Sequence, residues 1–357
     1  MAANDKGASV KLIRWRTAIT AAIGTSVLVA GSAVTAGCTT VQSHATVPLR
    51  LGYLPNITHA TDLIGIAGGY FHAALGPNVA FSTTAFTAGP DVVTSLFGGQ
   101  LDAGFIGPSP ALSAFMASHG AYQIVAGAAS GGAAFVVQPQ ITNVAQLKGK
   151  TVSSPQLGNT QDVSLRIWLK SKGLKTATVG TGDVTILPQS NANIVTAFQA
   201  KAIAGAWVPE PNVQTLIAAG GHVLINEAAL WPKGNFATTV LVVAKSYLKA
   251  HPTVIKGLLQ GELNAISHLQ SNKANAETEI NTAIKAATGK QLSSGILHAA
   301  MVNVTLTYDP IVSSITKDAQ NAYKLKFLST SSTKGLYDLS LLNALLKKNK
   351  LKPVATS

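Results

Sequence analysis

Short apolar runs alternate with longer amphipathic segments along most of the chain, which is the pattern of an α/β protein. The runs predict strands at 51–54, 79–86, 104–106, 121–128, 151–155, 184–187, 206–208, 222–225 and 238–243. Apolar positions at helical spacing predict helices at 60–71, 109–119, 160–171, 192–200, 212–219, 252–270, 275–287, 293–301, 315–328 and 339–346, with a further helix beginning at Pro90. Strands therefore alternate with helices until about residue 243, and helices follow.

The pattern occurs twice, about 100 positions apart. Residues 92–110 are matched by 194–211, and the strand and polar loop at 51–59 are matched by 151–160. Two βαβ units share apolar patterns by chance alone, which is the simpler alternative. The repeat nevertheless favours two α/β lobes with matching polar loops at their strand ends, as a binding protein that closes on its ligand requires.

The order of the elements predicts the lobe boundaries. We expect lobe one to comprise 49–135 plus 238–310, lobe two 136–237, and C-terminal helices at 311–350 to pack on lobe one. The chain then crosses between the lobes twice, after Gly131-Gly132 and again before 238–243. Two crossings form a hinge.

The N-terminus has the features of an export signal. Basic residues precede the apolar, small-residue segment 17–36, which ends immediately before the single cysteine, Cys38. This predicts a signal peptide at 1–37, a lipid-anchored Cys38, and a flexible tether at 38–48. Thr35 stands where lipoproteins usually have leucine, and an uncleaved membrane helix is the alternative for 17–36.

The charge is low in density and positive in sign. Charged residues make up 11% of the chain and the net charge is +13, which falls to +10 when 1–37, with four basic residues and Asp5, is removed. The segment 238–357 holds fourteen lysines and six acids. These lysines are scattered along helical segments without interleaved aromatic residues, so we expect a solvated basic surface and no nucleic-acid partner.

No motif for catalysis is present. The eight histidines do not fall at metal-ligand spacing, and there is no nucleophile elbow, phosphate-binding loop or dinucleotide fingerprint. We therefore predict no metal site, no cofactor and no enzymatic activity.

The polar loops suit anion binding. Helices are predicted to start at Thr58-His59, Ser109-Pro110, Asn159-Thr160 and Glu210-Pro211, each just after a strand. Unpaired N–H groups at helix starts hold oxyanions without a charged side chain. Beyond Cys38 the only arginines are Arg50 and Arg166, and Arg166 is expected on a helix surface, so an arginine clamp is not expected. Plain helix capping is the alternative role for Thr58, Ser109 and Thr160.

Three further side chains have two open interpretations each. His59 either donates to an anion or caps its own helix. Trp207 either contacts ligand or packs in a core. Glu210 either receives an ammonium group of the ligand or makes a hydrogen bond between the lobes that senses closure, and we favour the second.

The lipobox and six motifs in order resemble those of the substrate-binding lipoproteins of nitrate/sulfonate/taurine ABC importers, with the aliphatic sulfonate branch most similar. The motifs are GYLPNITHA at 52–60, FTAGP at 86–90, GPSP at 107–110, GGAA at 131–134, PQLGNTQD at 155–162 and WVPEP at 207–211. The resemblance spans about 49–345 and implies a type II periplasmic-binding-protein fold. It also implies ligand-binding roles for Asn56, Thr58, His59, Gly89, Ser109, Gly132, Asn159, Thr160, Trp207 and Glu210.

Together these features predict an extracytoplasmic, lipid-anchored, monomeric binding protein, at the periplasm or cell surface. It would capture a small anionic solute, an alkanesulfonate above all, and deliver it to permease and ATPase subunits. Within the family, nitrate, taurine or bicarbonate are the alternative ligands. A thiamin-pyrimidine-type enzyme on the same fold and a sensory or adhesive lipoprotein without a transporter are the alternatives from other classes.

Overall fold

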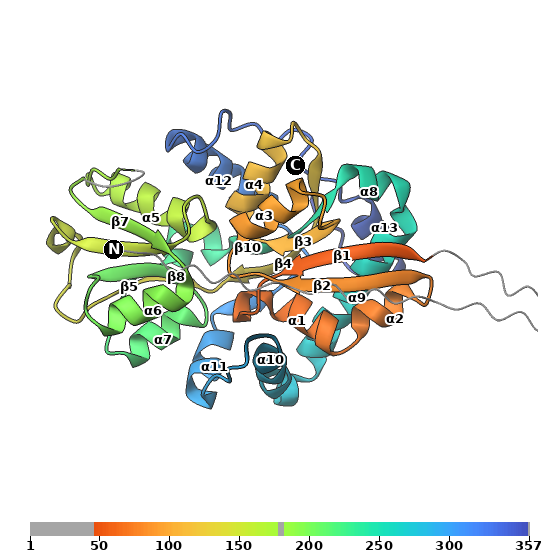
Figure 1. The fold of residues 1–357 in the computed structure, drawn as a ribbon, viewed down its shortest axis with the longest axis horizontal. Helices are drawn as coiled ribbons and strands as arrows, with labels where there is room; N and C mark the ends of the chain where they lie inside the picture. The colour runs from red at the N-terminus through yellow and green to blue at the C-terminus, as the bar shows by residue number, and fades with distance from the viewer. Residues whose placement is uncertain (1–45, 178–181, 356–357) are drawn as a thin grey trace, which may run out of the picture. The chain divides into compact units, whose positions relative to one another are not determined.

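The computed structural model describes residues 46–177 and 182–355. Residues 44–357 form one compact unit built on two β-sheets, which carry helices on their flanks (Figure 1). The predicted signal peptide, Cys38 and most of the predicted tether lie outside the described residues. Within the described part, no helix has the length and apolar character needed to cross a bilayer.

The first sheet, sheet A, has six strands in the order β11-β4-β10-β3-β1-β2. Its strands are β1 (Val47–Tyr53), β2 (Val79–Ala85), β3 (Ala103–Ile106), β4 (Tyr122–Gly131), β10 (Ala237–Ala244) and β11 (Val304–Leu306). β1 is parallel to both β2 and β3, and β10 is antiparallel to β3 and β4. The carboxyl ends of β1, β2 and β3 therefore share one edge of the sheet.

The second sheet, sheet B, has five strands in the order β7-β6-β8-β5-β9. Its strands are β5 (Ala133–Val137), β6 (Thr151–Pro155), β7 (Thr185–Gln189), β8 (Gly205–Pro209) and β9 (His222–Asn226). β6 is parallel to β7 and β8, and β5 is antiparallel to β8. β6, β7 and β8 are thus arranged like β1, β2 and β3, so the sequence repeat reflects a real structural repeat.

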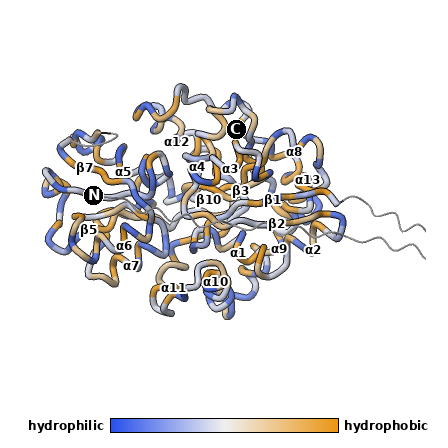
Figure 2. Tube along the Cα trace, in the orientation of Figure 1, coloured by the Kyte–Doolittle hydropathy of each residue, from blue (hydrophilic) through white to orange (hydrophobic). Residues whose placement is uncertain are grey.

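Helices follow the strands as the pattern predicts. Up to β10 they are the short 3-10 helix η1 (Ile57–His59), α1 (Ala60–Ala67), α2 (Tyr70–Leu75), α3 (Gly89–Phe97), α4 (Pro108–Ala117), 3-10 helix η2 (Val144–Leu147), α5 (Thr160–Ser171), α6 (Asn191–Gln199), α7 (Asn212–Ala218), and 3-10 helices η3 (Glu227–Leu230) and η4 (Pro232–Gly234). After β10 they are α8 (Lys245–Ala250), α9 (Pro252–Ser271), α10 (Lys273–Thr288), α11 (Ser294–Met301), α12 (Val312–Lys324) and α13 (Ser340–Lys348). Apolar and polar residues alternate along these helices, as amphipathic helices require (Figure 2).

Three details differ from the sequence-based expectation. The helix expected at 60–71 is two helices, α1 and α2, because Gly69 adopts a positive φ of 70° between them. The pattern missed α8, the short strand β11 and strand β5, since residues 133–137 indicated only an apolar connection into lobe two. β1 begins at Val47, within the segment expected to be the end of the tether.

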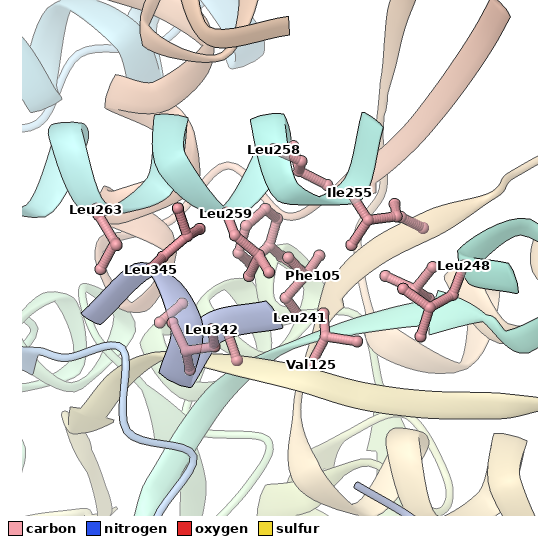
Figure 3. Close-up of a cluster of buried hydrophobic side chains, with 14 of the residues drawn as sticks. Phe105, Val125, Leu241, Leu248, Ile255, Leu258, Leu259, Leu263, Leu342 and Leu345 are labelled. Carbon is pink, nitrogen blue, oxygen red and sulfur yellow. The ribbon is translucent and has the colours of Figure 1, made fainter. Parts of the chain in front are cut away.

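The largest core lies between sheet A and the C-terminal helices. Ile255, Leu258 and Leu259 lie at helical spacing on α9 and pack with Leu342 and Leu345 of α13 over the sheet (Figure 3). All five side chains are at most 2% exposed. The predicted type II periplasmic-binding-protein fold with additional C-terminal helices is confirmed, and these helices are part of its core.

Candidate ligand-binding site

The N-termini of α4 and α5 meet, although α4 follows a strand of sheet A and α5 follows a strand of sheet B. The backbone N–H of Ser109 donates to Oγ1 of Thr160 at 3.4 Å, a long hydrogen bond. The Ser109 hydroxyl is buried and has no hydrogen-bond partner. Asn159 caps α5 by accepting from the Thr160 N–H at 2.8 Å. A buried orphan hydroxyl and a weak contact between two helix starts are features that a bound oxyanion would satisfy.

Gly89 belongs to the same group, because α3 begins there and packs against α4. A Cβ at Gly89 would lie 2.6 Å from Cγ of Pro110. The close approach of α3 to the start of α4 therefore requires glycine. Asp91 in the first turn of α3 also accepts from the Gln156 side chain, which follows β6, at 3.0 Å. A second contact thus joins the strand ends of the two sheets.

Asn56, Thr58, Gly132 and Glu210 form a second group where the chain passes from β4 to β5. Asn56 caps η1, its Oδ1 accepting from the Thr58 hydroxyl at 2.7 Å. Gly132 has a φ of +74°, and a Cβ there would lie 3.2 Å from Thr58 Cγ2 and 3.5 Å from Glu210 Cγ. The nearest atom to such a Cβ would be Val304 Cγ2 at 2.5 Å, so the crossing leaves no room for a side chain at 132.

Glu210 follows β8 and accepts hydrogen bonds from protein donors, most strongly at Oε1. Its Oε1 accepts from Asn303 at 2.7 Å and from the Gln214 side chain at 2.9 Å, while its Oε2 accepts from the Gln214 N–H at 3.4 Å. Burial raises the pKa of Glu210, and these hydrogen bonds oppose the rise. Asn303 directly precedes β11 of sheet A, so this arrangement has the form of the predicted hydrogen bond between lobes.

His59 is the last residue of η1, and its side chain is buried. Its Nδ1 lies 3.1 Å from Oδ2 of Asp62, and both residues are at most 3% exposed. Burial raises the pKa of Asp62, while the neighbouring His59 lowers it. This contact with Asp62 orients the imidazole ring of His59, the residue after Thr58.

Trp207 differs from the other predicted ligand-binding residues because it packs in a buried aromatic cluster. It is 0% exposed, stacks on Phe135 at 5.8 Å and donates its indole N–H to Glu227 at 2.7 Å. Burial raises the pKa of Glu227, and the Trp207 bond opposes the rise. These contacts agree with the prediction that Trp207 packs in a core.

A cavity of about 330 Å³ opens at the strand ends of both sheets. Its lining comprises Leu54, Pro55, Asn56, Phe86, Thr87, Ser190, Asn191, Ala192, Pro211, Asn212, Ile284, Thr288, Lys290 and Leu292. Of the ten predicted ligand-binding residues only Asn56 is among them. The lining is largely apolar, carries hydroxyl and amide groups, and includes one cation and no carboxylate.

Sequence reasoning missed Ser190 and Asn191 at the start of α6, where Ser190 caps the helix. The internal repeat could have indicated these residues, because aligning Val92 with Ile194 places Gly89, a predicted ligand-binding residue, opposite Asn191. The Asn191 Oδ1 atom is buried without a hydrogen-bond partner. A donor from a ligand or water would satisfy it.

The two arginines are committed elsewhere. Arg50 pairs with Asp102 at 2.7 Å, and Arg166 pairs with Asp162 at 3.0 Å. The expectation that Arg166 lies on the surface was wrong: it is 2% exposed, because Asp162 one helical turn earlier compensates its charge.

Throughout 46–177 and 182–355, no cluster of three or more histidine, cysteine or acidic side chains could hold a metal ion.

Comparison with known proteins indicates the fold and the family. A binding protein from Brucella abortus is 27% identical over 268 residues, covering 70% of this chain and 78% of its own. The taurine-binding periplasmic protein of Escherichia coli K12 is 29% identical over 50% of this chain and 54% of its own. The solved alkanesulfonate-binding protein of Xanthomonas axonopodis pv. citri, bound to MOPS, superposes with a TM-score of 0.64 at 19% identity, covering 80% of this chain and 95% of its own.

Fold and motifs together define the class: a substrate-binding protein of the nitrate/sulfonate/taurine group. The model of the NMT1-like family matches residues 42–284, more than half of the chain. The chain belongs to the NMT1-like family.

Proposed function

We propose that this protein captures a small organic oxyanion, an alkanesulfonate above all, between two closing lobes and delivers it to the permease and ATPase of an ABC importer. The lobes are those predicted from the sequence, one built on sheet A and the other on sheet B. Closure would follow from contacts that the bound anion makes with both. No catalytic step is part of this role.

The lining of the interlobe cavity carries the proposal. Phe86 and Leu54 after strands of sheet A, with Ile284 of α10, offer apolar surface that an alkyl tail would cover. Lys290 supplies the one positive charge, and no carboxylate lines the cavity to repel an anion. An anionic head with an apolar tail suits this combination, whereas nitrate would leave the apolar wall unused.

The start of α4 and the start of α5 are the proposed seat of the anionic head. Ser109 would turn its hydroxyl and backbone N–H toward it and Thr160 its hydroxyl, in place of their present 3.4 Å contact, while the Thr160 N–H stays with Asn159. Gly89 would permit the close approach, and Asn56 would join this seat to the cavity that it lines. Because Ser109 and Thr160 come from the two sides of the junction, an anion bound between them favours closure.

Taurine is the second candidate, since a curated relative of this chain is a taurine-binding protein. Taurine carries an ammonium group, which requires a carboxylate or several acceptors. Oε1 of Glu210 already accepts two hydrogen bonds from protein donors, and no carboxylate lines the cavity. The geometry therefore favours an alkanesulfonate without an amine.

A thermal-unfolding series separates these ligands. The chain from residue 39 onward is heated with alkanesulfonates of increasing tail length, taurine, nitrate, sulfate and bicarbonate. A ligand at 100 times its dissociation constant stabilises the folded state by about 2.7 kcal/mol. We expect the midpoint to rise most with alkanesulfonates and to increase with tail length. A rise with nitrate and none with any sulfonate would overturn the proposal.

The N-terminal features place this activity outside the cytoplasm. We propose that residues 1–37 are removed, that Cys38 receives a lipid, and that the protein acts as an anchored monomer. Mass spectrometry of the protein from its native membrane tests this, since the mature chain would begin at an acylated Cys38. Recovery of the unaltered protein in the membrane fraction, still carrying residues 1–37 and an unmodified Cys38, would instead indicate an uncleaved membrane helix.

A further inference from the structure

A second cavity, of about 390 Å³, has a lining rich in positive charge. It lies between the end of α5 with the turn that follows and the end of α12 with the loop that follows. Its lining comprises Arg166, Lys170, Gly173, Leu174, Lys175, Thr176, Lys324, Leu325, Lys326 and Phe327. It shares no residue with the cavity proposed for the alkanesulfonate.

The four lysines of this cavity, Lys170, Lys175, Lys324 and Lys326, have no acidic partner. Across the described residues, the ion pairs are made by arginine and histidine and none by lysine. The side chain of Lys170 has only a long contact, 3.5 Å, with the carbonyl oxygen of Lys324. All four lysines are exposed and surround one concavity, so they repel one another.

The carboxylates near the lysines accept hydrogen bonds from other groups. Glu227 lines an adjacent cavity with Lys170 and Lys324, but it is 1% exposed and accepts from Ser164 and Trp207. Asp162 is fully buried and pairs with Arg166, so that pair adds no net charge. Asp183 accepts from the backbone N–H of Lys175 at 2.7 Å. Counting Asp183 against the four lysines still leaves an excess of three positive charges around the cavity.

The rest of the lining adds shape to the charge. Leu174 is 5% exposed and forms part of the floor. The Arg166 guanidinium lies 5.8 Å from the centre of the Phe327 ring, which fixes that ring at the cavity wall. A concave apolar floor ringed by four lysine side chains suits a compact anion of high charge, which can draw several ammonium groups inward.

We propose that this cavity is a binding site for a phosphate-bearing anion, separate from the substrate cleft. The four lysine ammonium groups hold the phosphate oxygens, and Phe327 and Leu174 exclude water from one side. The shared chemistry is the phosphate, whether it is a free ion such as pyrophosphate or the headgroup of an anionic lipid. The site does not depend on the alkanesulfonate proposal.

The bound anion would also connect two parts of the fold. Lys170 and Lys175 adjoin sheet B, whereas Lys324 ends α12 and Lys326 follows it, and residues Ile315 and Ala319 of α12 pack with strands of sheet A. A phosphate held by both pairs of lysines would therefore favour the conformation in which these segments are close.

Calorimetric titration of the chain from residue 39 onward with pyrophosphate tests the site. The variant Lys170→Gln/Lys175→Gln/Lys324→Gln/Lys326→Gln removes the ring of charge. Its matched control, Lys347→Gln/Lys348→Gln/Lys350→Gln/Lys352→Gln, removes four exposed charges from the end of α13 and the segment after it. We expect pyrophosphate affinity to fall at least about tenfold in the first variant and to change less than about twofold in the second.

Sedimentation with vesicles of phosphatidylglycerol, against phosphatidylcholine alone, distinguishes the source of the phosphate. Binding of pyrophosphate that is lost only in the cavity variant supports a free ion. Binding of phosphatidylglycerol vesicles alone, lost in the same variant, supports a lipid headgroup. No binding of either probe, or equal loss in both variants, would overturn the site. Because neither probe is a sulfonate, these outcomes do not depend on the ligand of the cleft.

Discussion

Asn303 donates a hydrogen bond of 2.7 Å from its side-chain amide to Oε1 of Glu210, across 93 positions of sequence. Glu210 directly follows β8 of sheet B, and Asn303 directly precedes β11 of sheet A. The Glu210 residue is 1% exposed and the contact is partly buried, and a hydrogen bond to a carboxylate is stronger than one between neutral groups. It joins the two sheets at the crossing beside Gly132.

Replacement of Asn303 by alanine should weaken both stability and closure. Glu210 Oε1 would keep only its bond from Gln214, and the free energy of unfolding should fall by about 1–3 kcal/mol. Ligand affinity should fall about tenfold, because the closed form loses a contact between the sheets. Urea unfolding and calorimetric titration measure the two effects. Asn264→Ala, at an exposed position of α9, is the control, and equal behaviour of both variants would contradict the linking role.

The Ser109 hydroxyl offers a test in which binding and stability separate. It is buried but has no hydrogen-bond partner, so Ser109→Ala should leave the free energy of unfolding unchanged within about 0.5 kcal/mol, or raise it. If the hydroxyl donates to an oxyanion, the same variant should bind ligand about tenfold more weakly. Urea unfolding without ligand and titration with alkanesulfonate give the two values. Unaltered affinity would remove Ser109 from the site.

Thr160→Val tests the opposite face of the same junction. Valine keeps the shape of the side chain and loses the hydroxyl that accepts from Ser109 at 3.4 Å. Since that bond is long, we expect only a small loss of stability, with about a tenfold loss of affinity for the sulfonate. Thr196→Val in α6 is the control, because Thr196 is exposed and its hydroxyl contacts only its own helix. An equal effect of both variants on affinity would argue against a ligand contact at Thr160.

Trp207→Phe should behave as a core substitution. It removes the indole donor of Glu227 and part of a cluster with Phe135 and Trp168, at a cost of about 2–5 kcal/mol in unfolding free energy. The variant that remains folded at low temperature should bind ligand with an affinity within about threefold of the original chain. A folded variant that had lost binding would instead show that Trp207 contacts ligand.

The fold could be predicted from sequence because periodicity is local. Strands such as β3 and β8 are entirely buried short runs, and the internal repeat indicated which strands correspond. The same repeat paired the loop after β1 with the loop after β6, and both lead into helix starts that carry predicted site residues.

The site was harder to predict, because its geometry depends on long-range contacts. Motifs indicated Ser109 and Thr160 separately, but their contact depends on how α4 and α5 pack. The motif at 207–211 suggested a ligand-binding role for both Trp207 and Glu210. In the structure, Trp207 of β8 instead packs in the core of sheet B. Arg166 was misplaced because its partner Asp162 makes burial possible, and charge alone had suggested exposure.

Glu262 in α9 gives a prediction about pH. Both of its carboxylate oxygens are buried without hydrogen-bond partners, and burial together with the nearby Asp62 raises its pKa well above the usual value. The folded chain therefore holds this proton more tightly than the unfolded chain. As pH rises above the unfolded value of 4.5, the unfolded state loses its proton first, so the contribution of Glu262 to stability declines until the folded pKa is passed.

Glu262→Gln removes this titration and should flatten the pH dependence of stability. As pH rises from about 4.5 to neutrality, the free energy of unfolding of the variant should increase relative to that of the original chain. The increase should be about 1.4 kcal/mol for each unit by which the folded pKa exceeds the unfolded one. Asp62, paired with His59, remains in both proteins. Urea unfolding at a series of pH values provides the measurement. Glu277→Gln, whose side chain is 35% exposed, is the control; if it gained as much as Glu262→Gln, burial would not be the cause.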